Sequence, residues 1–263
     1  MKALPYISFA LSGAALALSI SSFTISASRE HIAGVVRQEI SANPKAIIES
    51  VDAFAKAEQV RRAATDEKKI IENKADIANA KGFPYIGNPN GAITLVYFFD
   101  SNCSYCKMVD PALKNIVATN PDVKIVHREI PILSKTSRLA AHIANIVWST
   151  HPDKYATLHD LFMGHKGALT ENDIEQLLKQ AIGDETASKL LADIENFDGN
   201  DAVHAANNRV QESLSIATTS KITGTPVVVV IEADTPTSVI RGAVENFQER
   251  LQALVEKARS AKH

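Results

Sequence analysis

The chain has 263 residues, 45% of them hydrophobic, so it can form one large domain with a sizeable core, or one domain and an additional arm. Its formal net charge is −2, and it contains no run of Lys and Arg interleaved with aromatic residues, which argues against a nucleic-acid partner. Two cysteines, Cys103 and Cys106, cannot form a disulfide framework or complete a four-thiolate zinc site. Three interpretations remain: one redox pair, one structural disulfide, or two metal ligands.

Residues 1–28 have the composition of a targeting segment. Lys2 is followed by an uncharged stretch, rich in Ala, Leu, Ile and Ser, that runs from Ala3 to Ser28. The pattern predicts either a signal peptide or an uncleaved inner-membrane anchor formed by residues 3–28, with a buried helix as the less favoured alternative. We therefore expect a location in the periplasm or cell envelope. That compartment is oxidising, so a lone cysteine pair can persist there as a disulfide.

Residues 29–80 are expected to form a helical arm. Asn43-Pro44 marks a break, because Asn caps helices and Pro suits the first helical position. An apolar stripe at helical spacing follows, which consists of Ile47, Ile48, Val51, Phe54 and Ala55 and continues through Val60, Ala63, Ile70 and Ile77. The stripe favours a homo-oligomer formed through residues 29–80. The alternatives are a helix packed on its own domain and a solvated spacer.

Residues 81–91 are rich in Gly and Pro and are expected to be a linker. The pattern then predicts a strand over 92–99, a helix over 103–119 and a strand over 123–132, which together make a βαβ unit. A helical segment is expected from 134 to about 218, with a capping box formed by Thr170 and Asp173 and a helix end at Gly183. A strand over 227–231, a turn over 232–237, a strand over 238–241 and a helix over 244–258 complete the chain. This order predicts an α/β domain with helices on both faces of a central sheet and one inserted helical lobe.

The cysteine pair directly follows the first predicted strand, at a strand-to-helix turn. Cys103 would then lie at a helix N-terminus, where unpaired backbone N–H groups and the helix dipole stabilise a thiolate. Cys106 would lie one helical turn further on, close enough to resolve a mixed disulfide. This placement predicts thiol–disulfide exchange.

Gly224-Thr225-Pro226 precedes a continuous apolar strand. A proline at a strand start, after a glycine, is a candidate for a cis peptide bond. Together with the cysteine pair and the order of elements, we expect a cis Thr225-Pro226 bond that faces the cysteines and leaves backbone groups free to pair with an extended substrate.

The run Cys103-Ser104-Tyr105-Cys106-Lys107, with Pro111 downstream, resembles the active-site helix of the thioredoxin superfamily. The helical insert with Lys154-Tyr155 and His159-Asp160-Leu161-Phe162, the Thr225-Pro226 dipeptide and the closing Arg241-Gly242-Ala243 resemble the DsbA-like branch. Gly87-Asn88-Pro89 and Gly91, together with the helical arm, are similar to envelope proteins of the ScsC type.

This resemblance implies a thioredoxin fold with an inserted helical domain over residues 92–263, in addition to the N-terminal helical arm. It implies no cofactor beyond a redox-active Cys103-Cys106 disulfide. Cys103 would be the nucleophile, Cys106 the resolving cysteine, and Thr225 and Pro226 the substrate-facing residues.

One position departs from the family pattern. A buried Glu commonly lies six residues before the first cysteine in that branch, whereas this chain has Tyr97, which stays neutral at pH 7. Asp100 and Glu129 are the candidate replacements. Ser104, Tyr105 and Lys107 are expected to support the site, Lys107 either as a positive charge near the sulfurs or as a solvated surface residue.

The predicted function is an envelope thiol–disulfide oxidoreductase that acts as an oxidase, an isomerase or both. Its expected partners are unfolded or misoxidised exported proteins and a membrane redox partner. Tyr105, and a Thr before the proline, resemble isomerase-type members, and an oligomer would present several thiols to one client. The alternatives are a copper(I)-handling protein that uses the same two thiolates and a non-enzymatic surface protein with a static disulfide. The eight histidines show no metal-ligand spacing, so no metal site is predicted.

Overall fold

The computed structural model describes residues 29–79, 81–195, 200–231 and 238–260. The predicted targeting segment and the predicted turn over 232–237 lie outside these ranges. No helix within the described ranges is long and apolar enough to cross a membrane. The chain divides into two compact units, residues 1–63 and residues 64–263.

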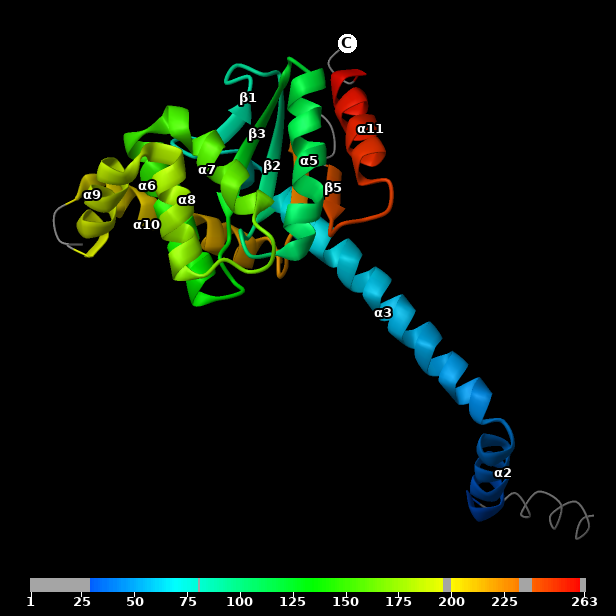
Figure 1. Ribbon diagram of the computed structural model, residues 1–263. Coiled ribbons are helices and arrows are strands. Elements are labelled where there is room, and N and C mark those ends of the chain that lie inside the picture. The colour runs from blue at the N-terminus through cyan, green and yellow to red at the C-terminus, as the bar shows by residue number, and fades with distance from the viewer. Residues whose placement is uncertain (1–28, 80, 196–199, 232–237, 261–263) are drawn as a thin grey trace, which may run out of the picture. The chain divides into compact units, whose positions relative to one another are not determined.

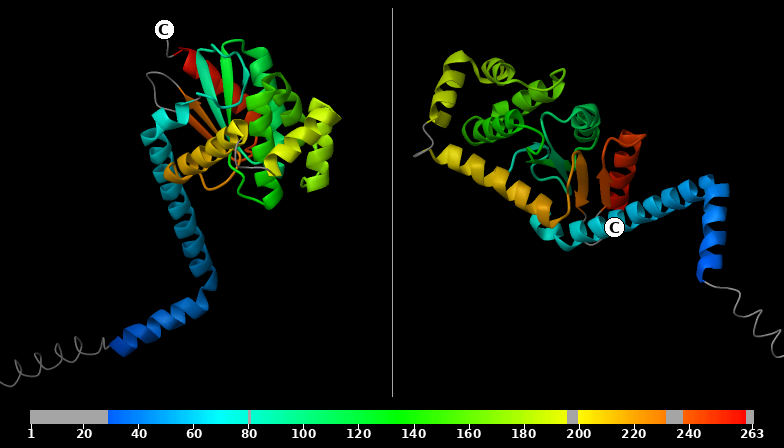
Figure 2. Two further views of the ribbon diagram at one scale, coloured as in Figure 1. Left: turned by 90° about the vertical axis from the view of Figure 1, so that its left-hand side faces the viewer. Right: turned by 90° about the horizontal axis from the view of Figure 1, so that it is seen from below.

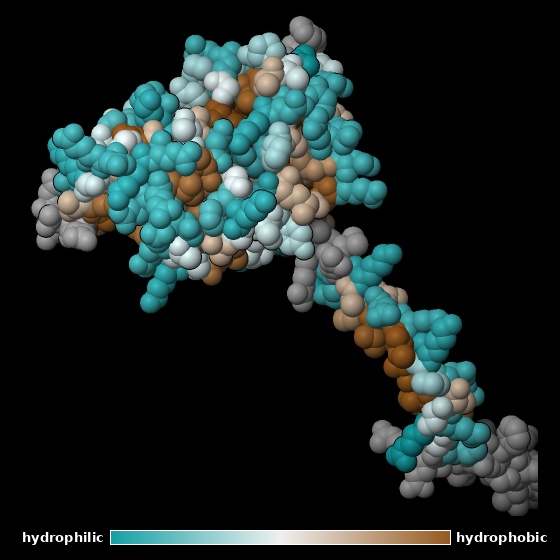
Figure 3. Space-filling view, in the orientation of Figure 1, coloured by the Kyte–Doolittle hydropathy of each residue, from teal (hydrophilic) through white to brown (hydrophobic). Residues whose placement is uncertain are grey.

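The first unit consists of helix α2 (Arg29–Ala42) and most of helix α3 (Pro44–Glu72) (Figure 1). The break between them at Asn43 confirms the prediction from the sequence. Large apolar side chains on both helices are exposed, namely Ile32, Val35, Val36 and Ile40 on α2 and Ile47, Ile48, Val51 and Phe54 on α3. Figure 3 shows this apolar surface along α3. We call these eight residues the exposed stripe.

The second unit contains a five-stranded sheet in the order β1-β3-β2-β4-β5. Its strands are β1 (Tyr85–Gly87), β2 (Ile93–Phe99), β3 (Val123–Glu129), β4 (Val227–Ile231) and β5 (Ser238–Arg241). Among the strand pairs that the structure describes, only β2–β3 is parallel, and helix α5 (Ser104–Thr119) joins these two strands. The predicted βαβ unit is therefore confirmed.

The sequence prediction missed strand β1, because it treated residues 81–91 as a linker. Tyr85 pairs with Val126 at the edge of the sheet, and Gly87 ends the strand with a φ of +85°. A Cβ atom at Gly87 would lie 2.6 Å from the carbonyl oxygen of Val123, so this close approach requires glycine. A three-residue strand is too short to show an alternating pattern, and its pairing with β3 is what forms it.

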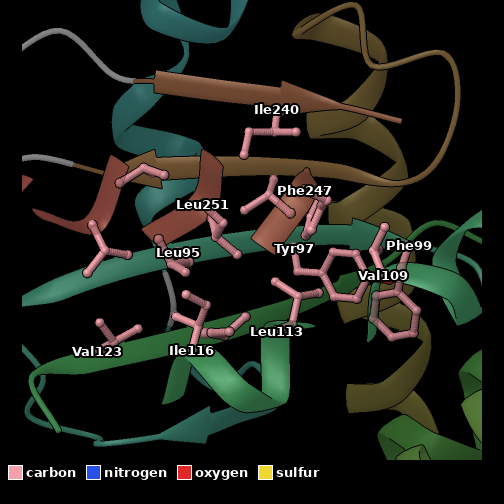
Figure 4. Packing of buried hydrophobic residues seen from close by; sticks show 14 of the residues in the cluster. Leu95, Tyr97, Phe99, Val109, Leu113, Ile116, Val123, Ile240, Phe247 and Leu251 are labelled. Carbon is pink, nitrogen blue, oxygen red and sulfur yellow. The ribbon is translucent and has the colours of Figure 1, made fainter. Parts of the chain in front are cut away.

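The two faces of β2 build two different cores, because successive side chains of a strand point to opposite sides. Leu95, Tyr97 and Phe99 pack against α5 and the C-terminal helix α11 (Phe247–Ser260), as Figure 4 shows. Val96 and Phe98 pack on the other face, which α4 (Lys74–Ala78), the end of α3 and α10 (Asp201–Thr219) cover (Figure 2).

The C-terminal end of the predicted arm belongs to this second core. Ile70 and Ile77 are fully buried beside Val96 and Phe98. The fully buried Arg128 of β3 donates hydrogen bonds to the backbone carbonyls of Asp76 and Asn79 and lies 3.9 Å from the ring centre of Phe83. The boundary predicted at residue 80 is therefore wrong, since the second unit begins at Ala64. The alternative interpretation, a helix packed on its own domain, holds for this end.

The helical insert lies between β3 and β4 and has a core of its own. It consists of α6 (Lys135–Thr150), α7 (Pro152–Gly164), α8 (Glu171–Ile182), α9 (Asp184–Glu195) and α10. The capping box of Thr170 and Asp173 is confirmed, and Gly183 ends α8 with a φ of +85°. The architecture is the expected thioredoxin-like sheet with an inserted helical domain.

Candidate active site

Cys103 lies at the point where the chain leaves the sheet and enters α5. It is the N-cap residue of that helix, and its Sγ accepts a hydrogen bond from the backbone N–H of Cys106 at 3.4 Å. Cys103 is the more accessible of the two cysteines, with 6% of the residue exposed, whereas Cys106 is fully buried. The predicted position at a helix N-terminus is confirmed, and both cysteines are free thiols.

The surroundings of Cys103 favour its thiolate form. The hydrogen bond that the Cys106 thiol donates is the largest cause, and it lowers the pKa of Cys103 from 9.0 to about 6. Burial opposes this shift, while hydrogen bonds from the Thr225 side chain and from the backbone N–H groups of Cys106 and Tyr105 add to it. A thiol with this pKa is mostly ionised at neutral pH and can act as a nucleophile.

Cys106 has the opposite properties. Burial raises its pKa, and its role as donor to Cys103 raises the pKa further. One sulfur is therefore ionised and near the surface, while the other is protonated and buried. This asymmetry favours Cys103 as the attacking sulfur of the pair.

The peptide bond between Thr225 and Pro226 is cis, as the sequence predicts. Pro226 directly precedes β4, and its carbonyl oxygen accepts a hydrogen bond from the backbone N–H of Gly242 at 2.8 Å. The loop brings Thr225 to the cysteines, since its carbonyl oxygen lies 3.5 Å from Cys103 Sγ. Residues separated by 122 positions along the chain thus meet at one sulfur.

Tyr97 lies directly behind the pair, on β2. Its hydroxyl donates to the backbone carbonyl of Cys106 at 3.3 Å, and its ring stacks on Phe99 at 4.9 Å between centres. Burial raises the pKa of Tyr97, so the residue is a neutral hydrogen-bond donor. It supports the first turn of α5 but offers no carboxylate in place of the family's buried acid.

The two acidic residues considered as replacements have different surroundings. Asp100 accepts hydrogen bonds from the backbone N–H groups of Asn102 at 2.8 Å and Leu133 at 3.0 Å, so its carboxylate holds the active-site turn. Glu129 is buried and accepts a short hydrogen bond from the Ser101 hydroxyl. Burial raises the pKa of Glu129 to about 8, so this carboxyl group can be protonated near neutral pH.

Three further residues of the motif were expected to support the site. Ser104 is the first residue of α5 and is exposed, and Tyr105 is 59% exposed. The Lys107 ammonium donates to the backbone carbonyls of His165 at 2.9 Å and Gly167 at 2.6 Å. Lys107 is therefore attached to the helical insert, and the interpretation of a merely solvated lysine is wrong.

A buried cluster around Asp110, one helical turn after Cys106 on α5, was not predicted. Asp110 Oδ1 lies 2.8 Å from Nε2 of His159, on α7, and Asp110 Oδ2 lies 2.9 Å from the Lys114 ammonium. Burial is the largest single influence and would raise the pKa of Asp110, but the hydrogen bonds and charges of His159 and Lys114 together outweigh it and hold the pKa at about 2. His159 is thus a buried histidine that is held in place by the Asp110 carboxylate. In the sequence, the one signal for this cluster was an acidic residue, Asp110, directly before Pro111 of the active-site helix.

Asn102 is a second residue that the sequence analysis missed. Its side-chain amide contacts both the start of α6 and the backbone of Leu169. A run of hydroxyl residues, Ser134, Thr136 and Ser137, was the available signal for a polar junction. Among the described residues, no three His, Cys, Asp or Glu side chains are grouped as metal ligands.

Two solved structures resemble this fold over most of its length. The catalytic domain of Proteus mirabilis ScsC is 26% identical, with a TM-score of 0.59, and the match covers 73% of this chain and 97% of that chain. A periplasmic thioredoxin-like protein from Salmonella enterica serovar Typhimurium is 29% identical, with a TM-score of 0.55, over 70% of this chain and 94% of that chain.

Curated relatives match shorter segments. A Na(+)/H(+) antiporter, NhaA 3, from Salinispora tropica is 23% identical over 142 residues, which are 53% of this chain but 20% of that protein. Disulfide bond formation protein D from Bacillus subtilis is 31% identical over 84 residues, which are 30% of this chain and 38% of that protein. The chain thus spans well under half the length of these relatives.

The family model of the DSBA-like thioredoxin domain matches residues 94–252. This segment contains the cysteine pair, the helical insert and the cis-proline loop. Because the match covers more than half of the chain and includes each of these features, the protein belongs to the DSBA-like thioredoxin domain family, a family of thiol–disulfide oxidoreductases.

Proposed function

We propose that this protein exchanges disulfides with exported proteins in the periplasm or cell envelope, with Cys103 and Cys106 as its redox pair. The observation that carries this proposal is the position of Cys103, whose sulfur has a pKa of about 6 and lies 3.5 Å from the Thr225 carbonyl. A reactive sulfur beside a loop with main-chain groups suits an extended polypeptide better than a small molecule.

The proposed oxidation of a client has two balanced steps. A client thiolate attacks Cys103 Sγ of the disulfide form, so that a mixed disulfide forms and the bond to Cys106 breaks, with Cys106 leaving and taking up a proton. A second client thiolate then attacks the client sulfur of the mixed disulfide and releases Cys103 as a thiolate. The client loses two electrons, which the Cys103-Cys106 pair gains, so the step needs no cofactor beyond the two cysteines.

The lowered pKa of Cys103 favours this direction. Stabilisation of the thiolate stabilises the reduced form, which makes the disulfide form a better oxidant and Cys103 a better leaving group. A membrane redox partner would then take the two electrons and restore the disulfide. The names of two relatives, a disulfide bond formation protein and a periplasmic thioredoxin-like protein, support the chemistry and the compartment.

The direct test measures two activities of the full chain: oxidation of a reduced unfolded protein by the disulfide form, and rescue of a scrambled disulfide protein by the dithiol form. We expect activity in at least the first assay and its loss in Cys103→Ser. If the wild-type chain turned over neither substrate, the proposed function would be refuted.

We further propose that the exposed stripe joins copies of this chain into a homo-oligomer. All eight large apolar residues of the exposed stripe lie at the surface, including Phe54 with 68% of its surface in contact with solvent. Contiguous apolar surface of this kind is unfavourable in water unless a partner covers it. An oligomer would also support disulfide isomerisation, because several cysteine pairs could act on one client.

This part of the proposal is tested by sedimentation of the full chain and of two variants. Phe54→Asp places a charge in the exposed stripe, whereas Lys56→Glu changes the charge at a polar position of the same helix. We expect a smaller sedimenting mass for Phe54→Asp and an unchanged mass for Lys56→Glu. A wild-type chain that sediments as a monomer would exclude the oligomer.

A further inference from the structure

The loop between α7 and α8, residues 165–170, is attached to the active-site segment at two points. Asn102, one residue before Cys103, accepts a hydrogen bond at Oδ1 from the backbone N–H of Leu169 at 2.6 Å. Lys107, one residue after Cys106, donates from Nζ to the carbonyls of His165 and Gly167 at 2.9 and 2.6 Å. The loop is thus held on both sides of the cysteine pair.

The amide of Asn102 is oriented by its partners. The backbone N–H of Leu169 can only donate, so the oxygen of the amide faces it, and the amide nitrogen must face the opposite side. There the nitrogen lies within 3.0–3.2 Å of the hydroxyl oxygens of Ser134, Thr136 and Ser137. One side chain therefore joins the active-site turn, the start of α6 and the loop.

Lys107 contributes to the loop rather than to the sulfur. The groups that lower the pKa of Cys103 most are Cys106, Thr225 and the backbone of Tyr105. The Lys107 ammonium instead donates to two loop carbonyls, and burial of this side chain lowers its own pKa. A charged donor with two carbonyl acceptors is a stronger attachment than a neutral hydrogen bond.

The attached loop faces solvent. Residues 166, 167 and 168 are exposed, although Leu169 is buried and fixes the end of the loop. Because the loop is attached one residue before Cys103 and one residue after Cys106, a polypeptide that extends across the motif would lie beside this backbone, whereas a small thiol would not need to. We propose that Asn102 and Lys107 are positioning residues that hold residues 165–169 as one wall of the client-binding site. This inference rests on the proposed function and adds a determinant of its substrate specificity.

The test compares two substrates of the full chain in its disulfide form: a reduced unfolded protein and reduced glutathione. For Asn102→Ala and Lys107→Met we expect the KM for the protein to rise about fivefold or more, while the rate constant with glutathione changes less than about twofold. Lys107→Arg keeps a charged donor, so its KM for the protein substrate should stay close to the wild-type value. Hydrogen exchange at the Leu169 amide should accelerate in Asn102→Ala, because its acceptor is lost.

The control is Lys135→Met, which removes an exposed charge at the start of α6. An equal rise in the protein KM for this variant would show a general charge effect and overturn the inference. Equal losses with both substrates in Lys107→Met would also overturn it, since they would place Lys107 in the sulfur chemistry. A wild-type chain inert toward glutathione and protein alike would refute the proposed function itself.

Discussion

The hydrogen bond between the two cysteines offers the sharpest test of the site. The pKa of Cys103 falls from 9.0 to about 6, a difference worth ~4 kcal/mol at ~1.4 kcal/mol per pH unit. The Cys106 thiol is the largest cause, and a hydrogen bond to a charged acceptor contributes about 1.5–3 kcal/mol. Removal of this donor in Cys106→Ala should therefore raise the pKa of Cys103 to between about 7 and 8. Burial, Thr225 and the backbone N–H groups would remain as the other influences.

The assay is a titration of the Cys103 thiolate by its ultraviolet absorbance, checked by the pH dependence of its alkylation rate. Cys106→Ser is the matched control, because its hydroxyl keeps a donor at the same position and should hold the pKa near 6. A pKa near 6 in Cys106→Ala, or the same value in the Ala and Ser variants, would refute the assignment of the shift to this hydrogen bond.

Three further predictions concern stability. The folded-state pKa of Cys103 is lowered, so its stabilisation of the reduced protein is complete above the ordinary pKa of 9.0 and is lost as the pH falls through about 6. In denaturant unfolding, the free energy of unfolding of the wild-type chain relative to that of Cys103→Ala should be about 2 kcal/mol greater near pH 8 than near pH 5. The comparison with the variant is needed because the raised pKa of Glu129 lowers the stability of both proteins over the same pH range. Ile77→Ala should lower the free energy of unfolding by about 3 kcal/mol, because Ile77 is fully buried. Ile48→Ala should lower it by less than about 0.5 kcal/mol, because Ile48 is exposed. Equal losses in the two variants would exclude the boundary at residue 64. Asp110→Ala should cost about 3 kcal/mol in the same assay by leaving His159 buried without its partner, and an unchanged free energy of unfolding would contradict that role.

Sequence patterns predicted the local features of this protein well. The strand-to-helix turn that places Cys103 at a helix N-terminus, the capping box at Thr170 and the helix break at Asn43 all depend on neighbouring residues. Their backbone conformations follow from side chains within about one helical turn, so they can be read without knowledge of distant contacts. The cis bond at Pro226 was predicted by combining a local signal with the order of elements.

The features that the sequence left open depend on residues far apart along the chain. Ile77 continues an apolar stripe whose earlier residues are exposed, and nothing local shows that it packs beneath β2 while Ile48 faces solvent. Strand β1 exists only because the edge of β3 offers hydrogen-bonding groups to a three-residue segment.

By itself, the amino-acid sequence determined which two sulfurs form the redox pair candidate and which elements surround them. Only the tertiary structure decided their surroundings: the Thr225 carbonyl beside Cys103, the loop attached through Asn102 and Lys107, and the unpredicted pair of Asp110 and His159. The physical reason is that hydrogen bonds and burial act over a few ångströms in space, whatever the separation along the chain.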